Sequence, residues 1–292
     1  MEVTATMLKI RNLIHLTHVI EDNLKRREAE RFYLDVFAAQ TFFDARPMPG
    51  LERDETLTLI GKTQLIPMAP VDEVSTMAKD LRRYAPGFMG IALKVENTRA
   101  VRAHLEGKGL RPIAAPGFED VFVLTRRQES CNVPYEFCAV EMPNDLRLRP
   151  GWSPDWWRDV HPLGIDGLVS VGTVVSDLDA AVKFYSDVFN FELAGKGEIQ
   201  SEGARAVLFR AADFVLEVME PIRSGTPLAD FIERKRPGFY SINWKVKSLP
   251  KALEYLKSKG LHLIDGPERT TLDPRDAFGA RHTFAEKSTL AG

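Results

Sequence analysis

An internal repeat constrains the fold of this 292-residue chain more than any other feature of its sequence. The segment 86–110, PGFMGIALKVENTRAVRAHLEGKGL, returns at 237–261 as PGFYSINWKVKSLPKALEYLKSKGL. Identical residues in the two segments, such as Gly87 and Gly238, are all 151 positions apart. Self-similarity at a fixed offset indicates a duplicated structural unit. The chain therefore consists of two copies of one fold.

Further matches extend this repeat over most of the chain. Phe32-Tyr33 corresponds to Phe184-Tyr185 at an offset of 152, and Met68 corresponds to Met219 at an offset of 151. Agreement at several separate places is improbable by chance.

Each half divides again into two units, each with the order strand, helix, strand, strand, strand. In the second half, residues 168–176 are rich in valine and predict a buried strand. Asp177 then precedes apolar residues at helical spacing, which predicts a helix. The remaining predicted elements are strands at 204–209 and 213–219, a strand at 241–246, a helix at 250–259, and strands at 261–264 and 282–286.

A connector rich in proline and tryptophan separates the two halves. We expect a first domain at 1–145, a linker at 146–164 and a second domain at 165–292. Prolines disfavour continuing a strand or helix through this linker. Its tryptophans, Trp152, Trp156 and Trp157, are expected to pack the linker onto a domain.

Composition excludes several classes of partner. The formal net charge is −2, with 39 basic and 41 acidic residues, so the basic excess needed to bind nucleic acid is absent. No stretch of about 18 apolar residues predicts a membrane helix, and residues 1–12 do not resemble a secretory signal. Cys131 and Cys138 would lie too far apart on one strand to form a disulfide. We therefore expect a soluble, cytoplasmic protein.

The pattern of a strand, then Asp177-Leu178-Asp179, Phe184-Tyr185 and Asp187-Val188-Phe189 resembles the vicinal oxygen chelate superfamily. That superfamily includes glyoxalase I, bleomycin-resistance proteins and type I extradiol dioxygenases. The resemblance covers roughly 10–145 and 165–288. It implies an α+β fold in which four βαβββ units form two glyoxalase-like domains with cup-shaped mixed sheets.

The resemblance also implies where a divalent metal would be held, by histidines of first strands and glutamates of last strands. In similar proteins the histidine lies seven residues before the acid that opens the helix. That position is His15 in the first half and Ser170 in the second. Compared with the second half, the first half has three extra residues between Asp22 and Phe32. If these extra residues are placed before Asp22 instead, His18 becomes the equivalent of the metal-binding histidine. Because residues three apart point to opposite faces of a strand, only one of the two can face the cup, and we favour His15.

The other ligand positions are mostly occupied by residues that bind metals poorly. Neither domain carries the two histidines and one carboxylate of oxygen-activating iron sites, which argues against ring cleavage. The position of the second histidine falls on Gly90 in the first half and on Ser241 in the second. The glutamate position at the end of the first unit falls on Gln64 or Ile66 in the first half and on Glu217 in the second. The glutamate position at the end of the last unit falls on Glu136 in the first half and near Thr283 in the second.

His15 and Glu136 are the candidate catalytic residues. They are either two ligands of a metal (Fe, Mn, Zn or Ni), weakly held or absent, with Gln64 as a third ligand, or a metal-free acid–base pair. A hydrogen-bonded structural role for His15 stays open. The second-domain candidates are Glu217 and His282. Strand alternation favours a solvent-facing Glu217, and for His282, in the final strand, we favour a hydrogen-bonded structural role over metal ligation.

The leading hypothesis is a small-molecule enzyme with its site in the first-domain cup. It predicts lyase, isomerase or dioxygenase chemistry on an oxygen-rich or aromatic metabolite. The alternative is a metal-free binding protein of the bleomycin-resistance type that sequesters an aromatic ligand. An inactive scaffold is a third alternative. The expected partner is a small molecule, and a homodimer is left open.

Overall fold

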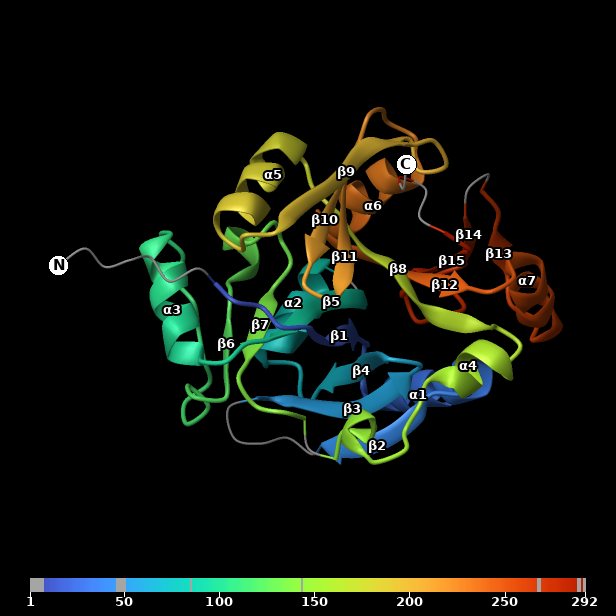
Figure 1. Cartoon of the computed structure of the whole chain (residues 1–292), viewed down its shortest axis with the longest axis horizontal. Helices are drawn as coiled ribbons and strands as arrows, with labels where there is room; N and C mark the ends of the chain where they lie inside the picture. Colours follow the sequence, from blue (N-terminus) through green and yellow to red (C-terminus); the bar gives the residue numbers. More distant parts are fainter. Residues whose placement is uncertain are drawn as a thin grey trace.

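The computed structural model describes residues 8–45, 51–84, 86–142, 144–266, 269–287 and 290. Two separate mixed sheets, built from residues 13–138 and 165–285, form the body of the molecule (Figure 1). Within the described ranges, no helix is both long and apolar enough to cross a membrane.

The first sheet has seven strands in the order β2-β3-β4-β1-β5-β7-β6. At its centre, β1 pairs parallel with β4 and antiparallel with β5. The strands are β1 (Leu13–Val19), β2 (Gln40–Ala45), β3 (Arg53–Ile60), β4 (Thr63–Pro70), β5 (Gly87–Lys94), β6 (Phe122–Leu124) and β7 (Tyr135–Cys138), and the helices are α1 (Asn23–Phe37), α2 (Thr76–Tyr84) and α3 (Thr98–Gly107).

The second sheet has eight strands in the order β13-β14-β15-β12-β8-β11-β10-β9. Its central strand β8 pairs parallel with β11 and antiparallel with β12, as β1 does with β4 and β5. The strands are β8 (Ile165–Val174), β9 (Glu192–Ile199), β10 (Ala204–Ala211), β11 (Phe214–Pro221), β12 (Gly238–Val246), β13 (Leu263–Ile264), β14 (Thr270–Leu272) and β15 (His282–Ala285), and the helices are α5 (Leu178–Asp187), α6 (Pro227–Lys235) and α7 (Leu249–Ser258).

This architecture confirms the predicted fold class. Three of the four units have a strand, a helix and three further strands. The second unit is shorter: among its described residues only β6 and β7 follow α3, and the missing strand is reduced to an isolated bridge between Ile113 and Leu124.

The register of the sheets locates the three extra residues of the first half. Val19 pairs with Met68 in the first sheet, and Val174 pairs with Met219 in the second. Val19 and Val174 are therefore equivalent, 155 positions apart, as are the helix-capping residues Asp22 and Asp177. Consequently the extra residues lie inside α1, which has 15 residues against 10 in α5.

Each first helix begins where the acid predicts it. The Asp22 side chain accepts a hydrogen bond from the backbone N–H of Lys25, and Asp177 accepts one from Ala180. These bonds satisfy amide groups that the first turn of a helix leaves unpaired.

The two domains share one hydrophobic core. It contains residues from the helix-bearing face of both sheets and from the helices between them. Helices of different domains also touch: His104 of α3 hydrogen-bonds the carbonyl oxygen of Val188 beside α5, and the Tyr255 hydroxyl of α7 donates to carbonyl oxygens at the end of α1. The domains therefore pack back to back, and each sheet turns its other face, the cup, away from the shared core.

A glycine in each copy of the repeat allows this close approach. A Cβ at Gly87 would lie 2.7 Å from the carbonyl oxygen of Gly279 in the other domain. One at Gly238 would lie 3.1 Å from the carbonyl oxygen of Asn132, again across the interface. The repeated Pro-Gly-Phe motif thus marks the two points where the backbones of the domains meet.

A chain of buried hydrogen bonds crosses the interface. The Trp244 indole donates to His282 Nδ1 (3.0 Å), so His282 carries its proton on Nε2 and donates it to the Tyr33 hydroxyl (3.1 Å). Tyr33 then donates to His18 Nδ1 (2.8 Å), and His18 Nε2 donates to the carbonyl oxygen of Phe278 (3.0 Å). Every donor has an acceptor, which keeps both imidazoles neutral.

The other half of the interface has an equivalent contact. Tyr185, the counterpart of Tyr33, accepts a hydrogen bond of 2.9 Å from the hydroxyl of Tyr135, the counterpart of His282. Tyr185 also hydrogen-bonds Thr173, the counterpart of His18. In both domains, the helix tyrosine therefore joins its own first strand to the last strand of the other domain.

The connector packs against the domains through one of its tryptophans. Trp157, in the short helix α4 (Asp155–Asp159), is buried, and its indole donates to the carbonyl oxygen of Phe37 at 3.0 Å. Trp156 is half exposed.

Replacing Tyr33 with phenylalanine should destabilise the whole protein. Tyr33→Phe removes the hydroxyl between His18 and His282, leaving one buried donor and one buried acceptor unpaired, at a cost of about 1–3 kcal/mol. Urea unfolding followed by circular dichroism measures this loss. Tyr255→Phe is the matched control, because its half-buried hydroxyl can be replaced by water, and a loss no larger than that of the control would contradict the role given to Tyr33.

Candidate functional site

A row of four residues crosses the cup face of the first sheet. Gln64 of β4 pairs with His15 of β1, His15 pairs with Ala92 of β5, and Ala92 pairs with Glu136 of β7. Side chains that are in register across neighbouring strands point to the same face of a sheet. The structure therefore brings His15, Gln64 and Glu136 onto one surface, whereas His18 faces the shared core.

Ile14 departs from strict strand alternation. An irregularity in the pairing of β1 with β5 lies between Leu13 and His15. As a result, Ile14 packs with Ala92 and Cys138 on the cup side.

His15 is buried and uncharged. It is only 4 % exposed, and its Nδ1 has no hydrogen-bond partner among the described residues. Burial, followed by the positive charges of Arg53 and Arg147, lowers its pKa to about 3. His15 therefore presents a neutral imidazole at physiological pH.

The pKa of Glu136 is shifted in the opposite direction. Burial raises its pKa, and the charge of Arg53 opposes that rise only in part. The Cys138 thiol donates to one of its carboxylate oxygens at 2.9 Å. Arg53 itself hydrogen-bonds Glu55 at 2.6 Å. A partly accessible carboxylate with a raised pKa is suited to accept and return a proton.

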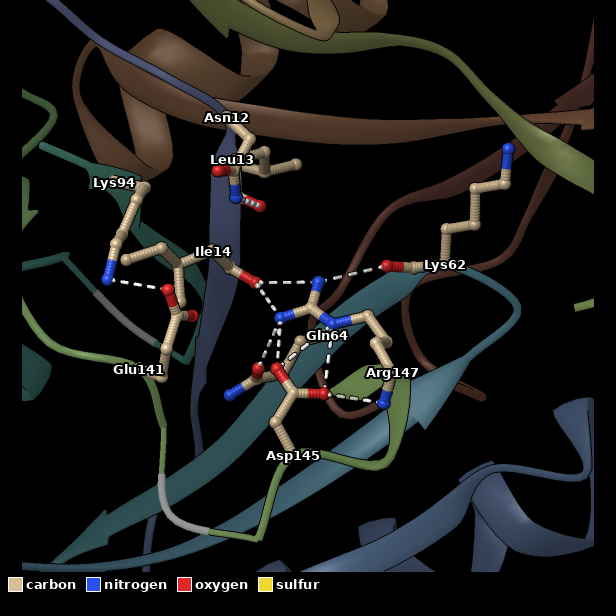
Figure 2. Close-up of polar contacts among 9 residues, drawn as sticks. All are labelled: Asn12, Leu13, Ile14, Lys62, Gln64, Lys94, Glu141, Asp145 and Arg147. Carbon is tan, nitrogen blue, oxygen red and sulfur yellow. Dashed lines mark hydrogen bonds and ion pairs between the residues drawn. The ribbon is translucent and has the colours of Figure 1, made fainter. Parts of the chain in front are cut away.

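Arg147 closes one end of the cup (Figure 2). Its guanidinium forms an ion pair with Asp145, with a shortest distance of 2.6 Å. The same guanidinium donates to the carbonyl oxygens of Ile14 (3.4 Å) and Lys62 (3.2 Å) and to Gln64 Oε1 (3.1 Å). A residue of the connector thus joins β1 to the β3–β4 turn.

The contact with Arg147 fixes the orientation of the Gln64 carboxamide. A guanidinium offers only donors, so it must face the amide oxygen. The amide nitrogen points away from Arg147 in Figure 2, and it is buried without a partner among the described residues. Gln64 is therefore oriented as a hydrogen-bond donor.

A pocket of about 460 Å³ lies beside this group and between the two domains. Gln64 and Arg147 form part of its wall in the first domain. Trp152 of the connector and Leu168 and Phe214 of the second domain contribute apolar surface. A compartment of this size and character can hold a small organic molecule.

The cup of the second domain contains a buried ion pair. Glu217 is only 1 % exposed and accepts a hydrogen bond of 2.9 Å from Arg269. Ser170 donates to the other carboxylate oxygen at 3.3 Å, and Asn243 donates to Ser170 at 2.7 Å. The expectation that Glu217 faces solvent is therefore wrong: its strand is covered on both faces, so alternation does not expose either side.

His282 does not join Glu217 in the second cup. Its neighbour Thr283 hydrogen-bonds Thr271 at 3.1 Å, while His282 points to the opposite face and contacts Tyr33 and Trp244. His282 is thus part of the interface, in a structural role.

The residues of both cups fit a resident divalent metal poorly. Among the described residues, no group of three histidine, cysteine, aspartate or glutamate side chains is placed to hold an ion. In the first cup, Arg147 already occupies Gln64 Oε1, leaving only His15 and Glu136, both under the positive charge of Arg53. In the second, Arg269 already neutralises Glu217. The donor set that bound metals require is therefore incomplete in either cup.

Comparison with known proteins agrees with this architecture. Residues 170–278 match the family described as the Glyoxalase/Bleomycin resistance protein/Dioxygenase superfamily. The glyoxalase-like fold extends over both halves: a triple mutant of 4-hydroxymandelate synthase from Streptomyces coelicolor superposes with a TM-score of 0.71 and 14% identity, covering 97% of this chain and 95% of that chain.

Shorter relatives match part of the chain. The mitochondrial methylmalonyl-CoA epimerase of Bos taurus is 25% identical over 127 residues, 43% of this chain and 69% of the epimerase. The uncharacterized protein YqjC of Bacillus subtilis is 24% identical over 117 residues, 37% of this chain and 84% of that protein. Each of these matches is about as long as one glyoxalase-like domain.

Sequence reasoning missed the three arginines that set the charge of the cups, Arg53, Arg147 and Arg269. Arg147 follows Asp145 by two residues, a pattern that Asp273 and Arg275 repeat with the same contacts, although the Arg275 side chain is 85% exposed and that of Arg147 only 21%. The local sequence therefore carries no signal that separates the arginine that reaches a cup from the exposed one.

The buried histidines should make the protein sensitive to acid. Burial lowers the pKa of His15 to about 3 and of His18 to about 4, and also lowers that of His282. The unfolded chain binds protons at these residues below about pH 6.5, before the folded chain does. The free energy of unfolding should therefore fall as the pH falls from about 6.5 to about 4.

Urea unfolding at a series of pH values measures this dependence. His18→Gln should reduce the slope. A stability that stays flat across this range would mean that the buried imidazoles are charged in the folded protein.

Proposed function

We propose that the chain is a small-molecule enzyme of the glyoxalase type that moves a proton at a carbon next to a carbonyl group. The observation on which this proposal depends is that the pKa values of two residues in the cup are shifted in opposite directions. Environment keeps His15 neutral and raises the proton affinity of Glu136. Pairs of titratable groups whose pKa values are pushed apart are typical of acid–base sites.

Glu136 is the proposed base. Its carboxylate takes the proton from the carbon of the substrate, and the electron pair of that bond moves onto the carbonyl oxygen. A pKa raised towards neutrality gives the carboxylate the affinity to hold this proton and later to return it.

His15 and Gln64 are the proposed donors to the carbonyl oxygen. A neutral imidazole carries one N–H group, and His15 Nδ1 has no hydrogen-bond partner within the described part of the chain. The Gln64 amide nitrogen is likewise free among the described residues. Two donors held in a buried site stabilise the negative charge that develops on oxygen, without the reorganisation that water would need.

The comparisons support this class of chemistry. A methylmalonyl-CoA epimerase is among the relatives, and 4-hydroxymandelate synthase shares the fold of the whole chain. An epimerase inverts a carbon centre, which removal of a proton from one face and return of a proton to the other would achieve. The carbonyl compound would reach the cup from the pocket of about 460 Å³ whose wall includes Gln64. No metal is needed for the steps assigned to Glu136, His15 and Gln64.

Deuterium exchange tests the proposal without a known product. Methylmalonyl-CoA, other acyl-CoA thioesters and simple 2-oxo acids would be incubated with the protein in D₂O, and exchange at the carbon next to the carbonyl would be followed by NMR. Glu136→Gln should slow exchange by about 10²–10⁴-fold, the usual contribution of a general base. Removing metal ions with EDTA should leave the rate unchanged.

His262→Ala, a change at an exposed residue, is the matched control and should behave like the wild-type protein. Exchange that survives both Glu136→Gln and His15→Ala would remove the first cup as the site. Tight binding of an aromatic compound with no exchange or turnover of any kind would instead favour the ligand-sequestering alternative.

A further inference from the structure

Glu217 is a carboxylate inside the second cup, where burial of an unpaired charge would be costly. Its position on β11 is level with Gly172 of the central strand β8. Arg269, which enters from the segment before β14, provides the compensating charge at 2.9 Å and is itself only 5 % exposed.

The side chains around this pair are rich in oxygen. Ser170 contacts Glu217 directly, and Asn243 contacts Ser170. In the part of the chain that the structure describes, Ser241 Oγ and Asn243 Oδ1 are buried without a hydrogen-bond partner. A carboxylate with hydroxyl and carbonyl oxygens nearby is the donor set that hard cations prefer. The positive charge in this set, however, is a guanidinium.

The first cup has a related arrangement on the equivalent strand, although there the arginine forms its ion pair with Asp145 and only a hydrogen bond with the strand residue. Gln64 of β4 offers an amide oxygen, and Arg147 donates a hydrogen bond of 3.1 Å to that oxygen. Arg147 comes from the connector, whereas Arg269 comes from the end of the second domain. Two different segments of the chain therefore bring an arginine to the corresponding strand of each cup.

We propose that in each cup an arginine takes the place of a bound cation, Arg147 against Gln64 and Arg269 against Glu217. The proposal concerns charge and ligand oxygens, so it is independent of the reaction proposed above. Its consequence is that removing the arginine exposes ligand oxygens and creates affinity for a divalent ion.

Thermal unfolding with and without MnCl₂ tests the second cup, with NaCl at matched ionic strength as the reference. Arg269→Gln should lower the melting temperature, because Glu217 loses its counter-charge. Mn²⁺ should recover part of that loss, while the wild-type protein should show no shift. The double variant Arg269→Gln/Glu217→Gln is the matched control, and it should not respond to Mn²⁺.

Calorimetric titration with CoCl₂ tests the first cup. Arg147→Ala should bind Co²⁺ at least about tenfold more tightly than the wild-type protein, because Gln64 Oε1 becomes available beside the His15 imidazole. The added change His15→Ala should abolish the gain. Circular dichroism establishes that each variant is folded. If Arg269→Gln does not fold alone, its refolding yield with and without Mn²⁺ replaces the melting temperature.

Two results would overturn the proposal. One is stoichiometric binding of Mn²⁺ or Co²⁺ to the wild-type protein that disappears in His15→Ala or Glu217→Gln, since the arginines would then coexist with a metal. The other is a set of folded arginine variants that respond to neither ion. Metal bound through His15 would also contradict the donor role given to His15 in the exchange reaction. The other outcomes do not bear on that reaction, whose failure would be seen in Glu136→Gln instead.

Discussion

The hydroxyl of Tyr33 is the contact on which the arrangement of the two domains depends. It accepts from His282 and donates to His18, so it connects the last strand of one domain to the first strand of the other. Buried imidazoles tolerate this position only when neutral and fully hydrogen-bonded. Tyr185 and Tyr135 form the matching contact. The duplication therefore did not simply append a second domain; it produced an interface with approximate twofold symmetry.

This interface also explains why the two cups can differ. Because the domains pack through their helix-bearing faces, the residues of the cups do not take part in holding the domains together. The first cup could keep His15 and Glu136, while the second acquired an ion pair between Glu217 and Arg269. A shared fold thus carries two different sets of polar groups, as is common among proteins with one scaffold and many chemistries.

The fold could be predicted from the sequence because its signals are local and occur twice. The repeated segment and the capping residues Asp22 and Asp177 follow from spacing along the chain, and the choice of His15 followed from the resemblance to the vicinal oxygen chelate superfamily. The charge of the cups could not be predicted, because Arg147 and Arg269 reach them from distant segments. The Asp145–Arg147 pair illustrates this point: Asp273 and Arg275 have the same local sequence pattern and mutual contacts, and only the greater exposure of the Arg275 side chain distinguishes the two pairs. Glu217 shows a related difficulty, since a strand covered on both faces gives no alternation from which to infer direction.

The origin of Arg147 in the connector has a consequence for the order in which the molecule is completed. Every strand of the first sheet lies before residue 139, yet the side chain that orients Gln64 arrives with residues 145–147. During synthesis, the first sheet can therefore assemble while Gln64 is still free to rotate. Its final orientation is set only when the chain that leads to the second domain folds back onto Ile14 and Lys62. Completion of the first cup is in this way tied to the docking of the connector.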